Sequence, residues 1–268
     1  VVRQHRAQWT TTTQRHRPNT KTNTAYIQTI YTPTPQKPSR THKQKHKKQT
    51  TRIQEHQLNP QPKPIKPSKP QTIPMKHVIL ITGTPSVGKT TTAKALTEKL
   101  NAEYINLTDY AKNNNLILSD DKERCTSIVN EEAMQQKLAQ TINTTNNQNI
   151  IIDGHYASAV TPTQHKVQVF VLRRHPKELK TFMEQKGYTG NKLYENLQAE
   201  IIDVCLGEAV QFHAGRICEL DVTGKTPQKI VEDILDILQK RKTCIVGTVD
   251  WMGTLEKEGT LDQYLKLT

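Results

Sequence analysis

Residues 83–90 read Gly-Thr-Pro-Ser-Val-Gly-Lys-Thr, between an apolar run and a segment with helical periodicity. In that position the pattern Gly-x-x-x-x-Gly-Lys-Thr predicts a buried strand that leads into a phosphate-binding loop and then a helix. Backbone N–H groups from Gly83 to Thr90 can surround a phosphate, and the helix N-terminus adds the positive end of its dipole. Lys89 is expected to reach the β- and γ-phosphates, and the Thr90 hydroxyl to help hold Mg²⁺. The sequence therefore predicts the binding of a nucleoside triphosphate with Mg²⁺, and we expect ATP.

The positive charge of the chain is concentrated in residues 1–74. The net charge is +13, but residues 1–74 hold 15 Lys and Arg and one acidic residue, which leaves 23 basic and 24 acidic residues after them. This segment is rich in Thr, Gln, Lys and Pro, and such a composition buries too little apolar surface to offset its ordering entropy. We expect a disordered basic tail at 1–74, followed by a near-neutral globular domain.

Three interpretations of this tail stay open. It is an arm for RNA, a targeting segment, or an extension that the cell does not make, because Met75 is the first methionine and stands just before the first predicted strand. No apolar stretch is long enough to span a membrane, and we expect a cytoplasmic protein. Without a Cys-x-x-Cys pair, free thiols are expected for all four cysteines: Cys125, Cys205, Cys218 and Cys244.

Apolar runs alternate with helical periodicity after Met75. The expected strands are 77–82, 103–106, 149–153, 167–172 and 217–222. The expected helices are 89–100, 109–114, 131–143, 176–185, a long one that ends at 213, and 227–240, with an irregular acidic segment at 119–124. This order predicts an α/β fold of the P-loop NTPase type, a parallel five-stranded sheet with helices on both faces. Ligands bind such sheets at the carboxyl ends of the strands.

Candidate site residues directly follow the expected strands. Asp153 ends the strand 149–153, where P-loop proteins place the acid that orders the hydration shell of Mg²⁺, although Asp also suits a helix cap. His155 projects to the same side and orients a water or a phosphate, or else packs in the interior. Asp109 follows the second strand.

Two cationic segments complete the expected site. Arg173 and Arg174 follow the fourth strand, where guanidinium groups suit phosphate neutralisation. One of them can instead cap the next helix or pair with Glu178, and we favour Arg173 for the ligand. Residues 185–192 contain Lys186 and two glycines; we predict a mobile flap that closes over the phosphates, with an ordinary helix–helix loop as the alternative.

A GTPase is excluded by its missing motifs. The guanine-binding pattern Asn-Lys-x-Asp does not occur, because the pair Asn191–Lys192 is followed by Leu-Tyr. Asp153 is followed by Gly-His-Tyr and so does not begin an Asp-x-x-Gly switch. The short spacing between the P-loop and Asp153 favours a compact nucleotide or metabolite kinase over a motor ATPase.

The ordered motifs resemble the archaeal "putative adenylate kinase" family. This family is related to the eukaryotic coilin-interacting nuclear ATPase, a broad-specificity adenylate kinase linked to small-subunit ribosome maturation. The similar segments lie within 75–240 and are 83–91, 153–155, 169–173, 186–188, 195–196 and 199–200. The resemblance implies a nucleoside-monophosphate-kinase-like domain at 75–242, with an NMP-binding segment at 108–130 and a lid at 185–195. The extension 243–268 is expected to pack on this domain through Trp251 and Leu255.

The resemblance also implies roles for single residues. Phosphate contacts are implied at Ser86, Gly88, Lys89, Thr90 and Thr91, and a nucleotide contact at Lys225. Under this interpretation Lys89 and Mg²⁺ hold the ATP phosphates, with Thr90 and Asp153 serving the metal. Arg173 and Lys186 then cover the γ-phosphoryl group as it moves to AMP, and Lys112, after Asp109, is the candidate for the AMP phosphate.

Two residues depart from the family pattern. Ser86 stands where the family usually has Gly, which narrows the backbone conformations of the loop. Lys186 stands where the lid usually has Arg, which keeps the charge but loses the bidentate fork. We therefore expect slow adenylate kinase turnover with ATPase activity. The alternatives are an ATPase assembly factor that acts with a small-subunit ribosomal protein and rRNA, and a small-metabolite kinase of the shikimate or gluconate type.

Overall fold

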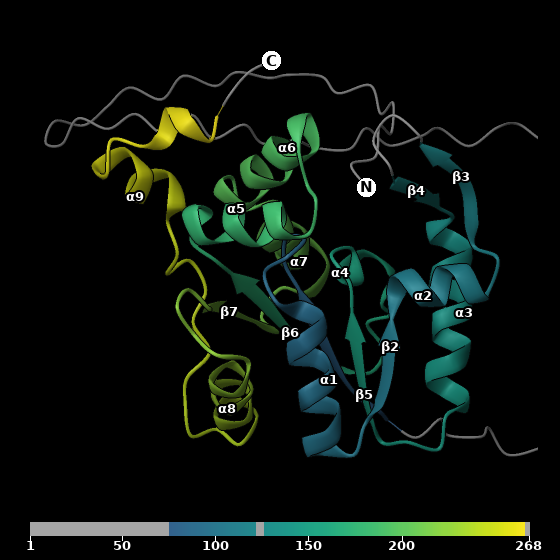
Figure 1. Cartoon of the computed structure of the whole chain (residues 1–268). Coiled ribbons are helices and arrows are strands. Elements are labelled where there is room, and N and C mark those ends of the chain that lie inside the picture. Colours follow the sequence, from purple (N-terminus) through teal and green to yellow (C-terminus); the bar gives the residue numbers. More distant parts are fainter. Residues whose placement is uncertain (1–74, 122–125, 266–268) are drawn as a thin grey trace, which may run out of the picture. The chain divides into compact units, whose positions relative to one another are not determined.

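Five parallel strands form the central sheet, in the order β2–β5–β1–β6–β7 (Figure 1). The computed structural model describes residues 75–121 and 126–265, and the predicted tail at 1–74 lies outside the described residues. The strands are β1 (His77–Thr82), β2 (Glu103–Asn106), β5 (Asn149–Asp153), β6 (Lys166–Arg173) and β7 (Ile217–Asp221). The parallel five-stranded sheet expected from the sequence is confirmed.

Each face of the sheet packs against its own apolar core. Ile79 and Ile81 of β1 contribute to one core, and Val78 and Leu80 contribute to the other, because successive side chains of a strand point to opposite faces. Helices that contribute to the first core are α1 (Lys89–Leu100), α5 (Pro176–Gln185), α6 (Gly190–Ile201), α8 (Pro227–Leu238) and α9 (Trp251–Lys257). Those of the second core are α2 (Leu107–Asn113), α3 (Glu131–Thr144), α4 (Ala157–Val160) and α7 (Val204–His213). Helices therefore cover both faces, as the sequence predicts.

Helix starts are fixed by local capping. The side chain of Asn130 accepts a hydrogen bond from the N–H of Ala133 at 3.0 Å and begins α3. The Thr226 hydroxyl accepts from the N–H of Lys229 at 3.3 Å and begins α8, with Pro227 in the first turn. Asn and Thr are favoured at this position because their oxygens satisfy free N–H groups. The expected start of α3 at residue 131 and of α8 at residue 227 is confirmed.

Residues 119–121, the described part of the acidic segment expected to be irregular, lie in a β-strand instead. Strand β3 (Ile117–Asp121) pairs antiparallel with β4 (Thr126–Val129) to form a two-stranded sheet. The prediction for 119–124 gave weight to its acidic residues, whereas pairing with the β-branched residues of 126–129 decides the conformation. Residues 122–125 lie outside the described residues.

The single long helix expected to end at residue 213 is two helices. Asp203 lies between α6 and α7 in the left-handed backbone conformation, with φ of 60°. Its carboxylate pairs with Arg173, which ends β6. The break therefore depends on an ion pair with a residue 30 positions earlier in the chain, which helix periodicity does not reveal.

The C-terminal segment packs on the domain as expected. Trp251 and Leu255 of α9 are 6 % and 0 % exposed and belong to the first core. A single turn of 3-10 helix, Leu261–Gln263, follows α9. None of the helices in the described part of the chain has the length and hydrophobicity needed to cross a lipid bilayer.

Two of the cysteines expected as free thiols lie against each other. Cys218, at the start of β7, meets Cys244 in the C-terminal segment, with their Cα atoms 4.9 Å apart, a separation that a disulfide can span. The two cysteines are 26 positions apart, so no local motif indicated the pairing. Cys205 is a free thiol, and Cys125 lies outside the described residues.

Candidate active site

The P-loop, residues 83–88, turns the chain sharply from β1 into α1. Gly83 and Gly88 have positive φ angles of 134° and 108°. A Cβ atom at Gly83 would lie 2.4 Å from the carbonyl oxygen of Leu172, so only glycine fits between the loop and β6. Ser86 is also left-handed, with φ of 70°, and its buried hydroxyl has no hydrogen-bond partner in the part of the chain that the structure describes. The loop thus combines two required glycines with one strained serine.

Lys89 lies at the first position of α1, directly after the loop. Its Nζ donates a hydrogen bond to the carbonyl oxygen of Thr84 at 2.9 Å, so the side chain folds back over the P-loop. Burial lowers the pKa of Lys89, and the nearby Asp153 carboxylate opposes this shift. A desolvated ammonium at this place interacts strongly with anions, because few water molecules screen its charge.

Asp153 is held in one orientation by three donors. Its Oδ2 accepts hydrogen bonds from Thr90 Oγ1 at 2.7 Å, from Tyr104 Oη at 3.0 Å and from Asn106 Nδ2 at 3.0 Å. Burial and, after it, the neighbouring Asp153 carboxylate raise the pKa of Tyr104 to about 12, so the phenol stays a donor. Carboxylate and hydroxyl oxygens are ligands that Mg²⁺ prefers, directly or through water. The donor set of Thr90 and Asp153 therefore fits Mg²⁺.

Sequence reasoning missed Tyr104 and Asn106. Both lie on β2, and Asn106 is the register partner of Asp153 in the parallel pair β2–β5. The polar residue at the end of the expected strand 103–106 was a signal, because ligand sites gather at that edge. The pairing of this strand with the Asp153 strand was not available from the sequence.

His155 lies two residues after Asp153, in the turn that follows β5. Its backbone carbonyl accepts a hydrogen bond from Thr82 Oγ1 at 3.2 Å, and its buried Nε2 has no partner among the described residues. Burial lowers the pKa of His155, and the charge of Lys89 lowers it further. The ring is therefore neutral at physiological pH. A neutral imidazole with an unpaired nitrogen can bind a water or a phosphate oxygen.

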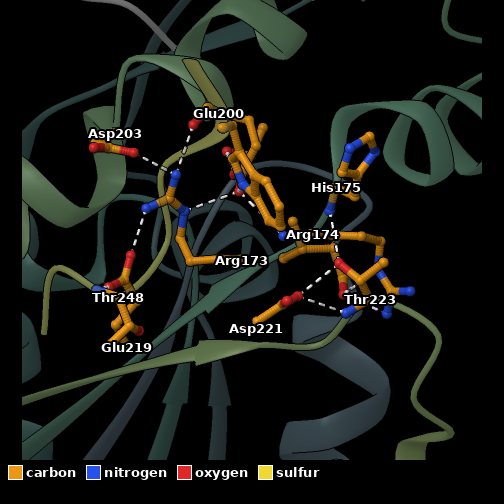
Figure 2. Close-up of polar contacts among 12 residues, drawn as sticks. Arg173, Arg174, His175, Glu200, Asp203, Glu219, Asp221, Thr223 and Thr248 are labelled. Carbon is orange, nitrogen blue, oxygen red and sulfur yellow. Dashed lines mark hydrogen bonds and ion pairs between the residues drawn. The ribbon is translucent and has the colours of Figure 1, made fainter. Parts of the chain in front are cut away.

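The sequence favoured Arg173 as the arginine that contacts the ligand, but in the structure Arg173 is paired with carboxylates and Arg174 lies at the P-loop. Arg173 is 1 % exposed, and its guanidinium binds Glu200, Asp203 and Glu219 (Figure 2). With its donors directed to carboxylates, Arg173 is a structural ion pair and not a free phosphate ligand, so the choice of Arg173 is corrected. The sequence did not reveal this role of Arg173, because the three acids come together only in the folded chain, from α6, from β7 and from the break between α6 and α7.

Arg174 is the arginine that contacts the P-loop. Its Nε and Nη2 donate to the carbonyl oxygen of Val87 at 3.4 and 3.3 Å, and its guanidinium lies 4.9 Å from the centroid of the Phe182 ring. It also pairs with Glu178, as one of the two sequence alternatives expected. Nη2 would lie 3.9 Å from a Cβ at Gly88. Arg174 therefore brings positive charge to the turn that precedes Lys89.

The flap joins α5 to α6. Lys186 is exposed and ends α5, and the left-handed Gly187 follows it with φ of 79°. Helix α6 begins already at Gly190, so only residues 186–189 lie outside the helices. Burial is the main cause of the lowered pKa of Lys89, and the positive charge of Lys186 lowers that pKa further.

The remaining candidates lie further from the P-loop contacts. Asp109 and Lys112 are exposed residues of α2, the helix that follows β2. The Nζ of Lys225, at the turn after β7, donates to Asp233 of α8 at 3.1 Å. No described contact joins these three residues to the P-loop, and their roles stay predictions.

Comparisons with known proteins show which family this chain resembles. A family model described as "AAA domain" matches residues 79–203. A protein named "Putative adenylate kinase" from Pyrococcus furiosus is 36% identical over 192 residues, which cover 71% of this chain and 98% of that protein. A protein of the same name from Pyrococcus abyssi is 38% identical over 190 residues, covering 71% and 98%.

Among solved structures, a thymidylate kinase from Candida albicans is similar at 19% identity with a TM-score of 0.43, covering 62% of this chain and 92% of that one. A similarity at this level does not bear on function. The similarity to the Pyrococcus proteins extends over nearly their whole length. This chain therefore belongs to the family of the archaeal proteins named "Putative adenylate kinase".

Proposed function

We propose that the protein is a Mg²⁺-dependent nucleoside monophosphate kinase that transfers the γ-phosphoryl group of ATP to AMP and forms two ADP, with broad nucleotide specificity. The observation that carries the proposal is the 2.7 Å hydrogen bond between Thr90 and Asp153, next to Lys89 at the carboxyl edge of the sheet. The name of the archaeal relatives supports the choice of AMP as acceptor.

Phosphoryl transfer depends mainly on alignment of two anions and neutralisation of their charge. Backbone N–H groups of the P-loop, from Gly83 through Ser86 and Gly88 to Thr91, surround the ATP phosphates. Lys89 leaves the carbonyl of Thr84 and binds the β- and γ-phosphates. When bound, Mg²⁺ neutralises phosphate charge, and Thr90 and Asp153 are the residues that hold it.

Cations on the opposite side complete the site. Arg174, in contact with Val87, takes the role first considered for Arg173 and neutralises charge near the loop. Lys186 on the flap moves onto the γ-phosphoryl group and excludes water when the lid closes. Asp109 and Lys112 on α2 face the acceptor nucleotide in this proposal, with the ammonium of Lys112 at the AMP phosphate.

The variant Lys89→Ala tests the proposal. We expect AMP-dependent ADP formation to fall about a hundredfold or more, because the variant lacks the cation that stabilises charge on the transferring group. The matched control is Lys94→Ala on the exposed side of the same helix, which should keep wild-type activity. Full ATP + AMP activity in Lys89→Ala would contradict the assignment.

His155 favours ATP hydrolysis as a second activity. His155 lies two residues after Asp153, its ring is neutral, and its buried Nε2 has no partner among the described residues. Such a nitrogen can orient an attacking water. Product analysis separates the candidates: AMP-dependent ADP indicates the kinase, and ADP with orthophosphate in the absence of AMP indicates the ATPase. An acceptor screen that gives no product with AMP, but phosphorylates a small hydroxylated compound, would instead favour a metabolite kinase.

A cytoplasmic role in small-subunit rRNA maturation extends this proposal. It rests on the family resemblance, which links such kinases to a ribosomal protein and rRNA. Co-sedimentation of the protein with small ribosomal subunits, dependent on ATP, is the expected result. Absence from the subunit fraction with and without ATP would remove this part of the proposal.

A further inference from the structure

A buried carboxylate outside the predicted site contacts the P-loop directly. Glu200 of α6 is 1 % exposed, and its Oε2 accepts a hydrogen bond from the Thr84 hydroxyl at 2.5 Å. Its Oε1 accepts from Arg173 Nε at 2.9 Å and from the backbone N–H of Arg174 at 3.1 Å (Figure 2). Both oxygens are therefore used, one for the loop and one for the end of β6.

Thr84 connects this carboxylate to Lys89. The hydroxyl of Thr84 binds Glu200, while its carbonyl oxygen accepts the hydrogen bond from Lys89 Nζ at 2.9 Å. The P-loop contains three residues with positive φ, Gly83, Ser86 and Gly88, and such a backbone needs contacts with its surroundings to keep one conformation. The hydrogen bond to Glu200 is a charge-assisted contact of this kind.

The C-terminal segment reaches the same carboxylate. The indole Nε1 of Trp251, the first residue of α9, donates to Glu200 Oε1 at 3.0 Å. The ring of Trp251 also lies edge-on to His175, with centroids 5.2 Å apart. A tryptophan in the last part of the chain is therefore one hydrogen bond away from the residue that holds the P-loop.

A second connection fixes this segment to Arg173. Glu219 of β7 accepts from Arg173 Nη1 at 2.7 Å with one oxygen. With its other oxygen Glu219 accepts hydrogen bonds from the backbone N–H groups of Gly247 and Thr248, at 2.8 and 2.9 Å. Residues 247–251 thus bind two of the three acids that hold the Arg173 guanidinium, Glu200 and Glu219.

We propose that Glu200 is a positioning residue that keeps the P-loop in its nucleotide-binding conformation, and that Trp251 of the C-terminal segment orients Glu200 for this task. The inference rests on the proposed use of the P-loop for ATP. It assigns to the C-terminal segment an effect on nucleotide affinity, in addition to covering the core.

Binding of ATP with Mg²⁺, measured by calorimetry on the full chain, tests the proposal. Thr84→Val lacks the donor to Glu200 and should raise the Kd for ATP at least tenfold, whereas Thr84→Ser keeps the hydroxyl and should stay within about threefold of wild type. Glu200→Gln is unsuitable by itself, because loss of a buried charge beside Arg173 can prevent folding.

The second variant is Trp251→Phe, which keeps an aromatic ring and lacks the N–H donor. We expect a threefold to tenfold higher Kd for ATP, with an unchanged KM for AMP, because AMP does not bind the P-loop. The matched control is Leu255→Val on the same helix, which loses packing without touching Glu200. It should lower the melting temperature and leave the Kd for ATP unchanged.

Two results overturn the proposal. One is a Trp251→Phe protein with a lower melting temperature and wild-type affinity for ATP, which indicates a purely structural residue. The other is an equal loss of affinity in Leu255→Val, which indicates general loosening of the C-terminal segment. Failure of the kinase proposal is distinguishable, because a wild-type protein that binds ATP but does not phosphorylate AMP still allows these binding measurements.

Discussion

Single residues carry measurable strain in the P-loop. Ser86 has a φ of 70°, and a residue with a Cβ atom is less stable in this conformation than glycine by about 1–2 kcal/mol. Its hydroxyl is buried and has no hydrogen-bond partner among the described residues, so no such bond compensates for the strain. The serine at this position therefore lowers the stability of the protein.

Ser86→Gly should raise the free energy of unfolding by about 0.5–1 kcal/mol, because relief of strain exceeds the added entropy of the unfolded chain. Urea denaturation of the nucleotide-free protein measures the change. Ser119→Gly, at an exposed position of β3, is the control and should lower stability, since glycine weakens a strand. A lower stability of Ser86→Gly would show that the hydroxyl makes a stabilising contact.

At the scale of elements, the turn after β5 is packed tightly against α2. Gly154 donates its N–H to the carbonyl oxygen of Ile81 at 3.3 Å. A Cβ at Gly154 would lie 2.7 Å from Leu107 Cδ1 and 3.0 Å from Leu107 Cβ. Leu107 is the first residue of α2 and is fully buried. The absence of a side chain at Gly154 therefore allows α2 to cover the end of β5.

Gly154→Ala should lower the free energy of unfolding by about 1–3 kcal/mol, because the added methyl group displaces a packed helix. Gly207→Ala is the matched control. Gly207 lies inside α7 with open space around it, so alanine there should raise stability by up to about 1 kcal/mol. Denaturation midpoints measure both changes, and equal signs for the two variants would contradict the packing argument.

At the scale of the whole molecule, a half-buried acid on α7, Glu208, makes stability depend on pH. Burial and, to a smaller extent, the charge of Glu131 at the start of α3 together raise the pKa of Glu208 from 4.5 to about 7. Between about pH 4.5 and pH 7, Glu208 is therefore protonated in the folded protein but ionised in the unfolded chain. Below about pH 4.5 the Glu208 carboxyl is protonated in both states and does not affect the free energy of unfolding. As the pH rises from there to about 7, the free energy of unfolding falls, and above pH 7 the loss stays constant.

Glu208→Gln should therefore raise stability at pH 8 and leave it nearly unchanged at pH 4. The loss of stability between pH 5 and pH 7 should become smaller in this variant. Thermal unfolding of both proteins across this pH range measures the difference. Identical pH profiles for wild type and Glu208→Gln would show that another group is responsible.

Much of the fold follows from local sequence. The apolar run 77–82, the glycines of the P-loop and the periodic segment 89–100 predict β1, the loop and α1 with the bounds that the structure has. Thr90 and Asp153 were predicted to serve the metal together, because Thr90 follows β1 and the P-loop and Asp153 ends β5. Such features depend on neighbours a few positions away, so the sequence contains the necessary information.

The tertiary structure decided which distant residues of the chain contact one another. Arg173 and Arg174 are adjacent and chemically equal in the sequence, yet Arg173 meets carboxylates up to 46 positions away, and Arg174 meets the P-loop 87 positions away. The role of Glu200, 116 positions after Thr84, has the same origin. Strand order and helix packing bring these groups together, and a linear pattern does not specify which groups meet. The sequence alone thus determined the nucleotide-binding loop and the class of fold, because both depend on local propensity and periodicity, whereas the folded chain decided which charges are buried as structure and which stay available to a ligand.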